Sequence, residues 1–238
     1  MLRRSKRRKR NENFAYNRES HKKGTTAVMA AEFIRGAHEA GHDVIRFDAA
    51  EMDVHPCIAC EHCHGAVSAC VFRDDFDELR DELLEADAVV FVSPVYYYGM
   101  SAQIKTVIDR FYAVDAQIHK NKKTALMLAF ADTTMESAQG AITSFYGMTD
   151  YLEWEIVDVV AAANSATPED ILNTDFPKKA YELGKTILGS VHDNEDTQAA
   201  TSLADLVARL ADFSKLAEET IEEAEKKDVF LDSADFYE

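Results

Sequence analysis

Ala88-Val89-Val90-Phe91-Val92 is an unbroken apolar run, and Ser93-Pro94-Val95-Tyr96-Tyr97-Tyr98-Gly99-Met100 follows it directly. A run without a polar interruption is typical of a central parallel strand that is buried on both faces. Three consecutive tyrosines after such a strand offer flat aromatic surfaces beside backbone amides. We expect Pro94 to stiffen the turn and Gly99 to allow close backbone approach. The segment therefore predicts a buried strand that ends in a loop able to hold a flat heteroaromatic ring.

Segments with strand and helix patterns alternate along the chain on both sides of this run. Strands are predicted at 13–17, 44–47, 88–92, 126–130 and 156–162, and helices at 25–40, 76–84, 102–112, 138–152 and 178–188. This alternation implies right-handed βαβ crossovers and a doubly wound parallel α/β sheet. Five strands with five helices match the strand order 2-1-3-4-5, in which ligands lie beyond the carboxyl ends of the first, third and fourth strands. The loops at 18–26, 93–101 and 131–137 are therefore the expected binding loops.

The chain divides into three predicted parts. Residues 1–12 form a basic arm that we expect to be disordered, because the first ten residues hold seven Lys or Arg and no acid. Residues 13–191 form the α/β domain, since 238 residues that are 47% hydrophobic can bury one sizeable core. Residues 192–238 form an acidic C-terminal helical extension, in which apolar residues recur at helical spacing.

The charge of the chain argues against several classes of partner. The net charge is −17, and because the first ten residues contribute +7, the remainder carries −24. A body this acidic repels nucleic acid and membrane surfaces. No run of eighteen apolar residues is present, and the first ten residues lack the apolar core of a signal peptide. We therefore expect a cytoplasmic protein with neither nucleic acid nor a membrane as partner.

All four cysteines lie close together, as Cys57-x2-Cys60-x2-Cys63-x6-Cys70. Overlapping x2 spacings let three thiolates converge on the corners of one cube, and a fourth closes the site from a short loop. A structural zinc ion fits less well, because it usually joins two separate cysteine pairs across a longer insert. The spacing favours an iron–sulfur cluster, and a zinc ion or unligated thiols stay open as alternatives.

Several motifs together resemble one known family. The segment 93–105, continuing through Ile108-Asp109-Arg110, is similar to the NAD(P)H-dependent FMN reductase family of flavodoxin-fold proteins. Further similar segments are Pro56-Cys57, Arg73-Asp74-Asp75-Phe76, 145–148, 151–156 and 178–184, so that the resemblance spans roughly residues 20 to 190. The compact cysteine spacing resembles the iron–sulfur flavoproteins within that family. The resemblance implies a flavodoxin-like fold, bound FMN, NAD(P)H as co-substrate, a homodimer, and a [4Fe–4S] cluster on Cys57, Cys60, Cys63 and Cys70.

The resemblance also assigns the FMN site. The family's phosphate loop typically reads Gly-Ser-x-Arg-x-Gly-Asn-Thr, and the matching stretch here runs from Glu19 to Thr26. Hydroxyl groups, a lysine charge and the amides of a helix N-terminus favour an anion there. This chain departs from the pattern at Glu19, which replaces a glycine with a negative charge, and the strand before it is unusually polar. The predicted phosphate residues are Ser20, Lys22, Thr25 and Thr26, and the predicted ring residues are Pro94, Val95, Tyr96, Tyr97, Tyr98, Gly99, Met100 and Thr133.

These features predict an FMN-dependent oxidoreductase. It would transfer electrons between NAD(P)H, or a [4Fe–4S] cluster, and a small-molecule or protein acceptor, while the redox chemistry belongs to the cofactor. One alternative is an iron–sulfur flavoprotein electron carrier that exchanges electrons with ferredoxin-like partners and has no nicotinamide activity. Another is a degenerate, non-enzymatic relative whose altered phosphate loop no longer holds FMN. The sequence shows no Ser–His–Asp arrangement or paired carboxylates, so no catalytic side chain is assigned.

Overall fold

The computed structural model describes residues 12–17, 24–65 and 69–189, with backbone only for residues 12–17. Most of the predicted basic arm, the whole C-terminal extension, and two predicted phosphate residues, Ser20 and Lys22, lie outside these ranges. Within the described ranges, no helix is both long and apolar enough to cross a membrane.

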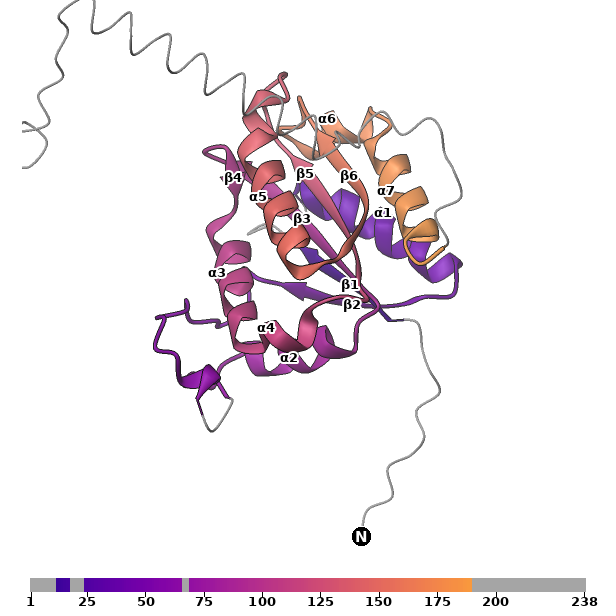
Figure 1. The fold of residues 1–238 in the computed structure, drawn as a ribbon. Helices are drawn as coiled ribbons and strands as arrows, with labels where there is room; N and C mark the ends of the chain where they lie inside the picture. Colours follow the sequence, from indigo (N-terminus) through magenta and orange to yellow (C-terminus); the bar gives the residue numbers. More distant parts are fainter. Residues whose placement is uncertain (1–11, 18–23, 66–68, 190–238) are drawn as a thin grey trace, which may run out of the picture. The chain divides into compact units, whose positions relative to one another are not determined.

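The centre of the fold is a sheet whose five parallel strands confirm the predicted doubly wound α/β class (Figure 1). In spatial order they are β2 (Asp43–Asp48), β1 (Glu12–Asn17), β3 (Ala88–Tyr96), β5 (Lys123–Ala129) and β6 (Glu155–Ala162). Among the parallel strands this is the predicted order 2-1-3-4-5. The sheet nevertheless has six strands rather than five, because β4 (Gly99–Met100) pairs antiparallel with β3. This short strand was not predicted.

The polar first segment does form a strand, and it lies inside the sheet. The register places Phe14 of β1 opposite Ile45 on one side and Val89 on the other. Pairing on both edges supplies partners for the backbone N–H and C=O groups of β1. Tertiary pairing therefore outweighs the polar composition of this strand.

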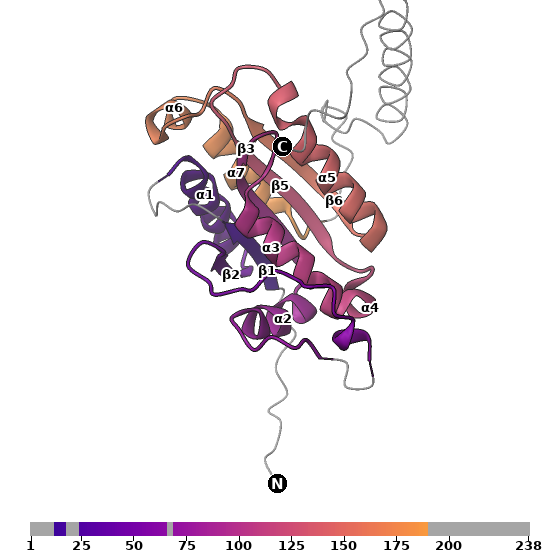
Figure 2. The same cartoon turned by 90° about the vertical axis from the view of Figure 1, so that its left-hand side faces the viewer.

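Helices cover both faces of the sheet (Figure 2). Because successive residues of a strand point to opposite faces, Phe91 belongs to one core cluster while Val90 and Val92 belong to the other. Helices α2 (Phe76–Glu85), α3 (Ala102–Arg110) and α5 (Glu136–Leu152) contribute Leu79, Ile104 and Phe145 to the first cluster, and helices α1 (Thr25–Glu39) and α7 (Phe176–Thr186) contribute Phe33 and Leu183 to the second.

The helix ends differ in detail from the predictions. Gly24, not Thr25 or Thr26, occupies the N-cap of α1, and no side chain caps that helix. The predicted helix 102–112 ends at Arg110, where the chain tightens into the 3₁₀ turn η2 (Phe111–Val114). Three further short elements were not predicted, namely η1 (His62–His64), α4 (Asp115–Ile118) and α6 (Pro168–Leu172).

Candidate functional site

The predicted ring loop is a tight β-hairpin. Strand β3 continues through Tyr96, and the turn residues Tyr97 and Tyr98 have φ angles of 47° and 64° before β4 begins. Two central residues with positive φ are the mark of a type I′ hairpin turn, whose twist matches that of the paired strands. Tyrosines rarely adopt this conformation, so the turn is strained.

One expectation about this loop is wrong. Pro94 does not stiffen a turn, because it lies within β3 in register with Ala129 of β5. A Cβ atom at Gly99 would lie an ordinary 3.8 Å from the Tyr96 carbonyl oxygen, so the described protein atoms do not by themselves require glycine there, and close approach to a ligand stays a prediction. The positive φ values fall on the tyrosines instead.

The hairpin presents its aromatic rings to solvent. Tyr97 is fully exposed at 101%, and Tyr96 and Tyr98 are more than half exposed. At the base of the hairpin, the backbone N–H of Ser101 donates a hydrogen bond of 3.0 Å to the Ser93 hydroxyl group. The carboxyl end of β3 therefore carries exposed aromatic side chains on a hairpin whose base is closed by a hydrogen bond.

The start of α1 carries a buried hydroxyl group that has no hydrogen-bond partner in the described part of the chain. Thr26 is 1% exposed, and its Oγ1 has no hydrogen-bond partner among the described residues. Thr25 beside it is also buried, and the first turn of α1 holds no acidic residue. A buried polar atom without a partner is costly, and the free amides of a helix N-terminus attract anions. This end of α1 therefore fits a phosphate group.

The loop after β5 is organised around a carboxylate. The carboxylate of Asp132 accepts hydrogen bonds from the Ser137 hydroxyl group at 2.5 Å and the Thr133 backbone N–H at 2.6 Å. The pKa of Asp132 is lowered, mainly by the hydrogen bond from Ser137. Thr133 itself is exposed. Its backbone is thereby fixed just beyond the carboxyl end of β5.

The sheet brings the carboxyl ends of β1, β3 and β5 to one edge. Asn17 at the end of β1 pairs with Val92 of β3, and Pro94 of β3 pairs with Ala129 at the end of β5. Their carboxyl ends are therefore neighbours, as the doubly wound topology requires for a ligand site. The predicted residues that meet at this edge are Thr25, Thr26, the hairpin 94–100 and Thr133.

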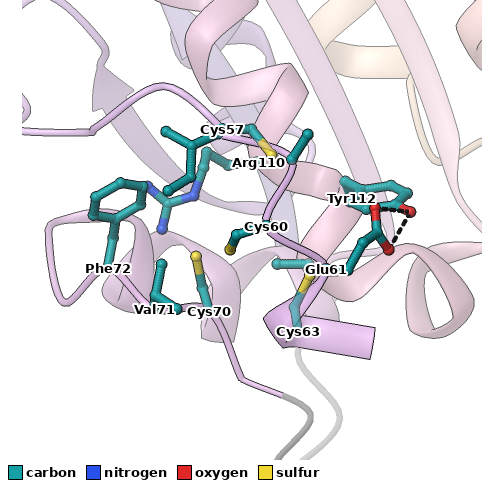
Figure 3. Close-up of a pocket in the computed structure, with 12 residues that line it drawn as sticks. Cys57, Cys60, Glu61, Cys63, Cys70, Val71, Phe72, Arg110 and Tyr112 are labelled. Atoms are coloured by element: carbon teal, nitrogen blue, oxygen red, sulfur yellow. Dashed lines mark hydrogen bonds between the residues drawn. The ribbon is translucent and has the colours of Figure 1, made fainter. Parts of the chain in front are cut away.

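The four cysteines line one pocket on the loop between β2 and α2 (Figure 3). All four are free thiols, and Cys63 and Cys70 are partly buried. Burial is the largest cause that raises the pKa of Cys63. The wall also includes Arg110, Tyr112 and apolar residues of the loop itself. Four soft sulfur donors around one hollow are the ligand type that iron–sulfur clusters use.

No three His, Cys, Asp or Glu side chains within the described ranges are grouped to hold a single metal ion. A [4Fe–4S] cluster does not require several cysteines around one ion, because each thiolate binds a different iron atom at a corner of the cluster. The convergence of all four cysteines on one pocket is therefore the observation that supports a cluster.

The backbone of the cysteine loop, defined here as the described residues 53–65 and 69–75, is strained between its first three cysteines. Ala59 and Glu61 have positive φ angles of 52° and 58°, which side chains other than glycine rarely adopt. Such strain persists only where surrounding contacts enforce it. Here the Tyr112 hydroxyl group donates to the Glu61 carboxylate at 3.0 Å, and the His64 imidazole Nε2 lies 2.9 Å from the Tyr112 carbonyl oxygen. The sequence carried no signal for these contacts, because the partners lie about fifty residues apart.

Comparisons with known proteins identify the family of this chain. A family model for the NADPH-dependent FMN reductases matches residues 18–166, which is more than half of the chain. This chain belongs to that family. As a family member it is similar to iron–sulfur flavoproteins of Methanocaldococcus jannaschii, at 34% identity over 87 residues, and of Archaeoglobus fulgidus, at 37% identity over 89 residues. Each match covers 37% of this chain and 45% or 40% of the relative, so the chain spans less than half the length of these curated relatives.

Solved structures of two other proteins share its fold. An NAD(P)H:quinone oxidoreductase from Methanothermobacter marburgensis aligns with a TM-score of 0.60 at 16% identity, over 76% of this chain and 98% of that chain. An azoreductase from Bacillus anthracis aligns with a TM-score of 0.57 at 16% identity, over 74% of this chain and 99% of that chain. At these identities the likeness shows the flavodoxin-like fold, and both the predicted fold class and the predicted family are confirmed.

Proposed function

We propose that this family member is an FMN-dependent oxidoreductase that takes electrons from NAD(P)H and delivers them to a small-molecule or protein acceptor. Its cysteine loop would hold a [4Fe–4S] cluster that joins the same electron transfer. The observation that carries the proposal is that a buried hydroxyl group with no partner among the described residues and an exposed aromatic hairpin lie at the same carboxyl edge of the sheet.

The start of α1 would hold the phosphate group of FMN. The Thr26 hydroxyl group is a buried donor without a partner among the described residues, so it would lose no contact with water when it binds a phosphate oxygen. The first backbone amides of α1 form the positive end of the helix dipole, which also favours an anion. Thr25 lies beside Thr26, and Ser20 and Lys22 precede it in the segment that the family model also matches. Glu19 in the same segment carries a negative charge, which disfavours a bound anion. We therefore expect the affinity for the FMN phosphate group to be the property that this departure from the family pattern changes.

The hairpin would hold the flavin ring. Tyr96, Tyr97 and Tyr98 supply exposed aromatic faces for stacking, and the backbone around Gly99 supplies donors for a polar ring edge. Thr133 lies at the neighbouring strand end. FMN held there would supply the hydride and electron-transfer chemistry of the reaction. The protein positions the ring and controls access to it.

The cysteine loop would hold the cluster through Cys57, Cys60, Cys63 and Cys70. All four line one pocket, and curated relatives with matching segments are named iron–sulfur flavoproteins. This feature also favours a second candidate function, an electron carrier that exchanges electrons with ferredoxin-like proteins without oxidising NAD(P)H. Steady-state NAD(P)H oxidation distinguishes the two, because only the reductase sustains it. A homodimer and a cytoplasmic location stay predictions.

One anaerobic experiment tests the proposal. Purified protein, incubated with FMN, ferrous iron and sulfide and then desalted, is analysed by ultraviolet–visible absorption with flavin and iron quantitation. We expect one FMN and about four irons per chain. In the Cys60→Ala variant, iron is expected to fall and flavin to stay. Protein that binds no FMN contradicts the reductase proposal, and flavin without iron contradicts the cluster alone.

A further inference from the structure

Arg110, the last residue of α3, carries a buried charge beside the cysteine pocket. Its side chain is 1% exposed, and the Asp74 side chain that faces it is 2% exposed. Nη1 donates to Oδ2 of Asp74 at 2.7 Å, and Nη2 donates to Oδ1 at 3.2 Å. Taking two charges out of water is costly, so a buried ion pair is weak evidence for a purely stabilising role. The role of the pair is therefore better judged from the segments that it holds in place.

The ion pair joins the two ends of the cysteine loop. At the amino end, Asp74 accepts a hydrogen bond from the His55 backbone N–H at 3.0 Å, and Arg110 Nη1 donates to the His55 carbonyl oxygen at 2.8 Å. At the carboxyl end, Asp74 is itself part of the loop and accepts from the Phe76 N–H. The His55 and Phe72 rings stack at 4.9 Å, and the guanidinium group lies 5.4 Å from the Phe72 ring centroid.

Arg110 also contributes to the pocket wall. It lines the same hollow as the four cysteines, and Figure 3 shows its guanidinium group on the Phe72 side of that hollow. Its Nη atoms are taken by Asp74 and His55. Its Nε–H is buried and has no acceptor among the described residues. Buried donors without acceptors are rare in folded proteins. An anionic, sulfur-bound group in the pocket would supply an acceptor.

We propose that Arg110 is the positioning residue of the cysteine pocket. It fixes the cysteine loop through its Nη atoms, and it offers its Nε–H and its positive charge to an iron–sulfur cluster bound by the four thiolates. This inference rests on the proposed function, since it requires the cluster. Hydrogen bonds to cluster sulfurs and the local net charge set the reduction potential. Reduction adds negative charge, so a neighbouring cation favours the reduced form and raises that potential.

The test compares the wild-type protein with Arg110→Gln, Arg110→Lys and Arg80→Gln after reconstitution with iron and sulfide. Arg80 lies on α2 and pairs with Asp77 and Asp81, so its replacement removes the same charge outside the cysteine pocket. The midpoint potential of the cluster is measured by mediated redox titration. For Arg110→Gln we expect the reduced-to-oxidised ratio at a given potential to fall about tenfold, a shift of about 59 mV for a one-electron couple. Arg110→Lys is expected to shift less, and Arg80→Gln to match the wild type.

The outcomes separate this inference from the proposed function. Wild-type protein that takes up no iron overturns the proposed cluster. A wild-type cluster whose potential is unchanged in both Arg110 variants, or is shifted equally in Arg80→Gln, overturns the role of Arg110 alone.

A second measurement covers the case in which Arg110→Gln does not fold. Arg110→Lys keeps a positive charge opposite Asp74, and its fold is checked by far-ultraviolet circular dichroism. In the metal-free protein, iodoacetamide is expected to alkylate the thiols of this variant several times faster than those of the wild type. The reason is that lysine cannot make the paired hydrogen bonds by which the Arg110 guanidinium group holds the loop. Equal alkylation rates in the folded variant overturn the inference.

Discussion

Gly140 of α5 lies directly against the backbone of Tyr98 at the tip of the aromatic hairpin. A Cβ atom at position 140 would lie 2.4 Å from the Tyr98 carbonyl oxygen, a distance that real Cβ atoms do not reach. The third residue of the tyrosine triplet is therefore seated on a helix that begins 38 residues further along the chain. The absence of a side chain at Gly140 sets where the hairpin rests.

Replacement of Gly140 by alanine should move the hairpin and weaken FMN binding by about tenfold, or about 1.4 kcal/mol. The dissociation constant is measured by quenching of flavin fluorescence. Gly147→Ala in the same helix is the matched control, because nothing lies within 4 Å of a Cβ atom there. The control should gain about 0.5–1 kcal/mol in free energy of unfolding and keep its FMN affinity. Wild-type FMN affinity in Gly140→Ala would show that the hairpin does not hold the ring.

Thr26→Val should separate phosphate binding from ring binding. The variant keeps the volume of the side chain but loses the unpartnered Oγ1, so the FMN-free protein should be as stable as the wild type, or more stable by up to about 1 kcal/mol. FMN should bind about tenfold more weakly, whereas riboflavin, which lacks the phosphate group, should bind unchanged. Isothermal titration calorimetry measures both affinities.

The control for that comparison is Thr124→Val. The Thr124 hydroxyl group is also buried, but it donates to the Val89 carbonyl oxygen at 2.8 Å. Its removal should lower the free energy of unfolding by about 1 kcal/mol without changing the preference for FMN over riboflavin. Equal losses of FMN and riboflavin affinity in Thr26→Val would contradict the assignment of the phosphate group to this end of α1.

Asp74 should contribute to the acid sensitivity of the protein. Burial by itself would raise the pKa of Asp74, but the hydrogen bonds from Arg110 and from the backbone N–H of His55 outweigh it and lower the pKa below 3.8. Between the folded and unfolded pKa values the unfolded chain binds more protons. The stability that Asp74 contributes is therefore fully present above the unfolded pKa of about 3.9 and is lost as pH falls through the lower folded value.

Asp74→Asn should remove this contribution. At pH 7 the variant should lose about 3–5 kcal/mol, because the charge of Arg110 stays buried without its partner. Below pH 4 the deficit should shrink, as the wild type loses the same interaction. Urea unfolding between pH 3 and pH 7 measures both effects, with Asp109→Asn as the exposed control at about 0.5 kcal/mol or less. A deficit that stays constant with pH would contradict the lowered pKa.

Lys122 should stabilise the end of α2. It is buried, and its Nζ donates to the carbonyl oxygens of Ala86 at 2.7 Å and Leu84 at 3.4 Å. Lys122→Met keeps the length of the side chain but removes both donors, so the free energy of unfolding should fall by about 1–3 kcal/mol. Lys120→Met is the control, because Lys120 is exposed and pairs only with Glu153 among the ion pairs of the described residues.

The effect of Lys122 should also depend on pH. Burial lowers the pKa of Lys122 from 10.5, so the unfolded chain binds more protons between the two pKa values. The wild type therefore gains stability from this group as pH rises toward 10.5, whereas Lys122→Met does not. The stability difference should widen across that interval in chemical unfolding. A difference that narrows as pH rises would contradict the direction of the shift.

Much of the architecture followed from local patterns. The apolar run 88–92 and its neighbours predicted a doubly wound sheet and the order of its parallel strands, because strand and helix periods are properties of short segments. The motif 93–105 predicted the family. The prediction that Pro94 stiffens a turn failed because the hairpin turn depends on the pairing of β3 with β4, and a proline alone does not specify that pairing.

The apolar run and the tyrosines after it, together with the cysteine spacing, thus determined the class of fold, the family and the residue types of both candidate sites. The contacts that position those residues come from the tertiary structure. Gly140 seats Tyr98, and Arg110 reaches Asp74 and His55 across 36 and 55 positions of the chain. Hydrophobic periodicity is a local signal, whereas these contacts arise when packed layers bring distant segments together and bury their polar groups as pairs.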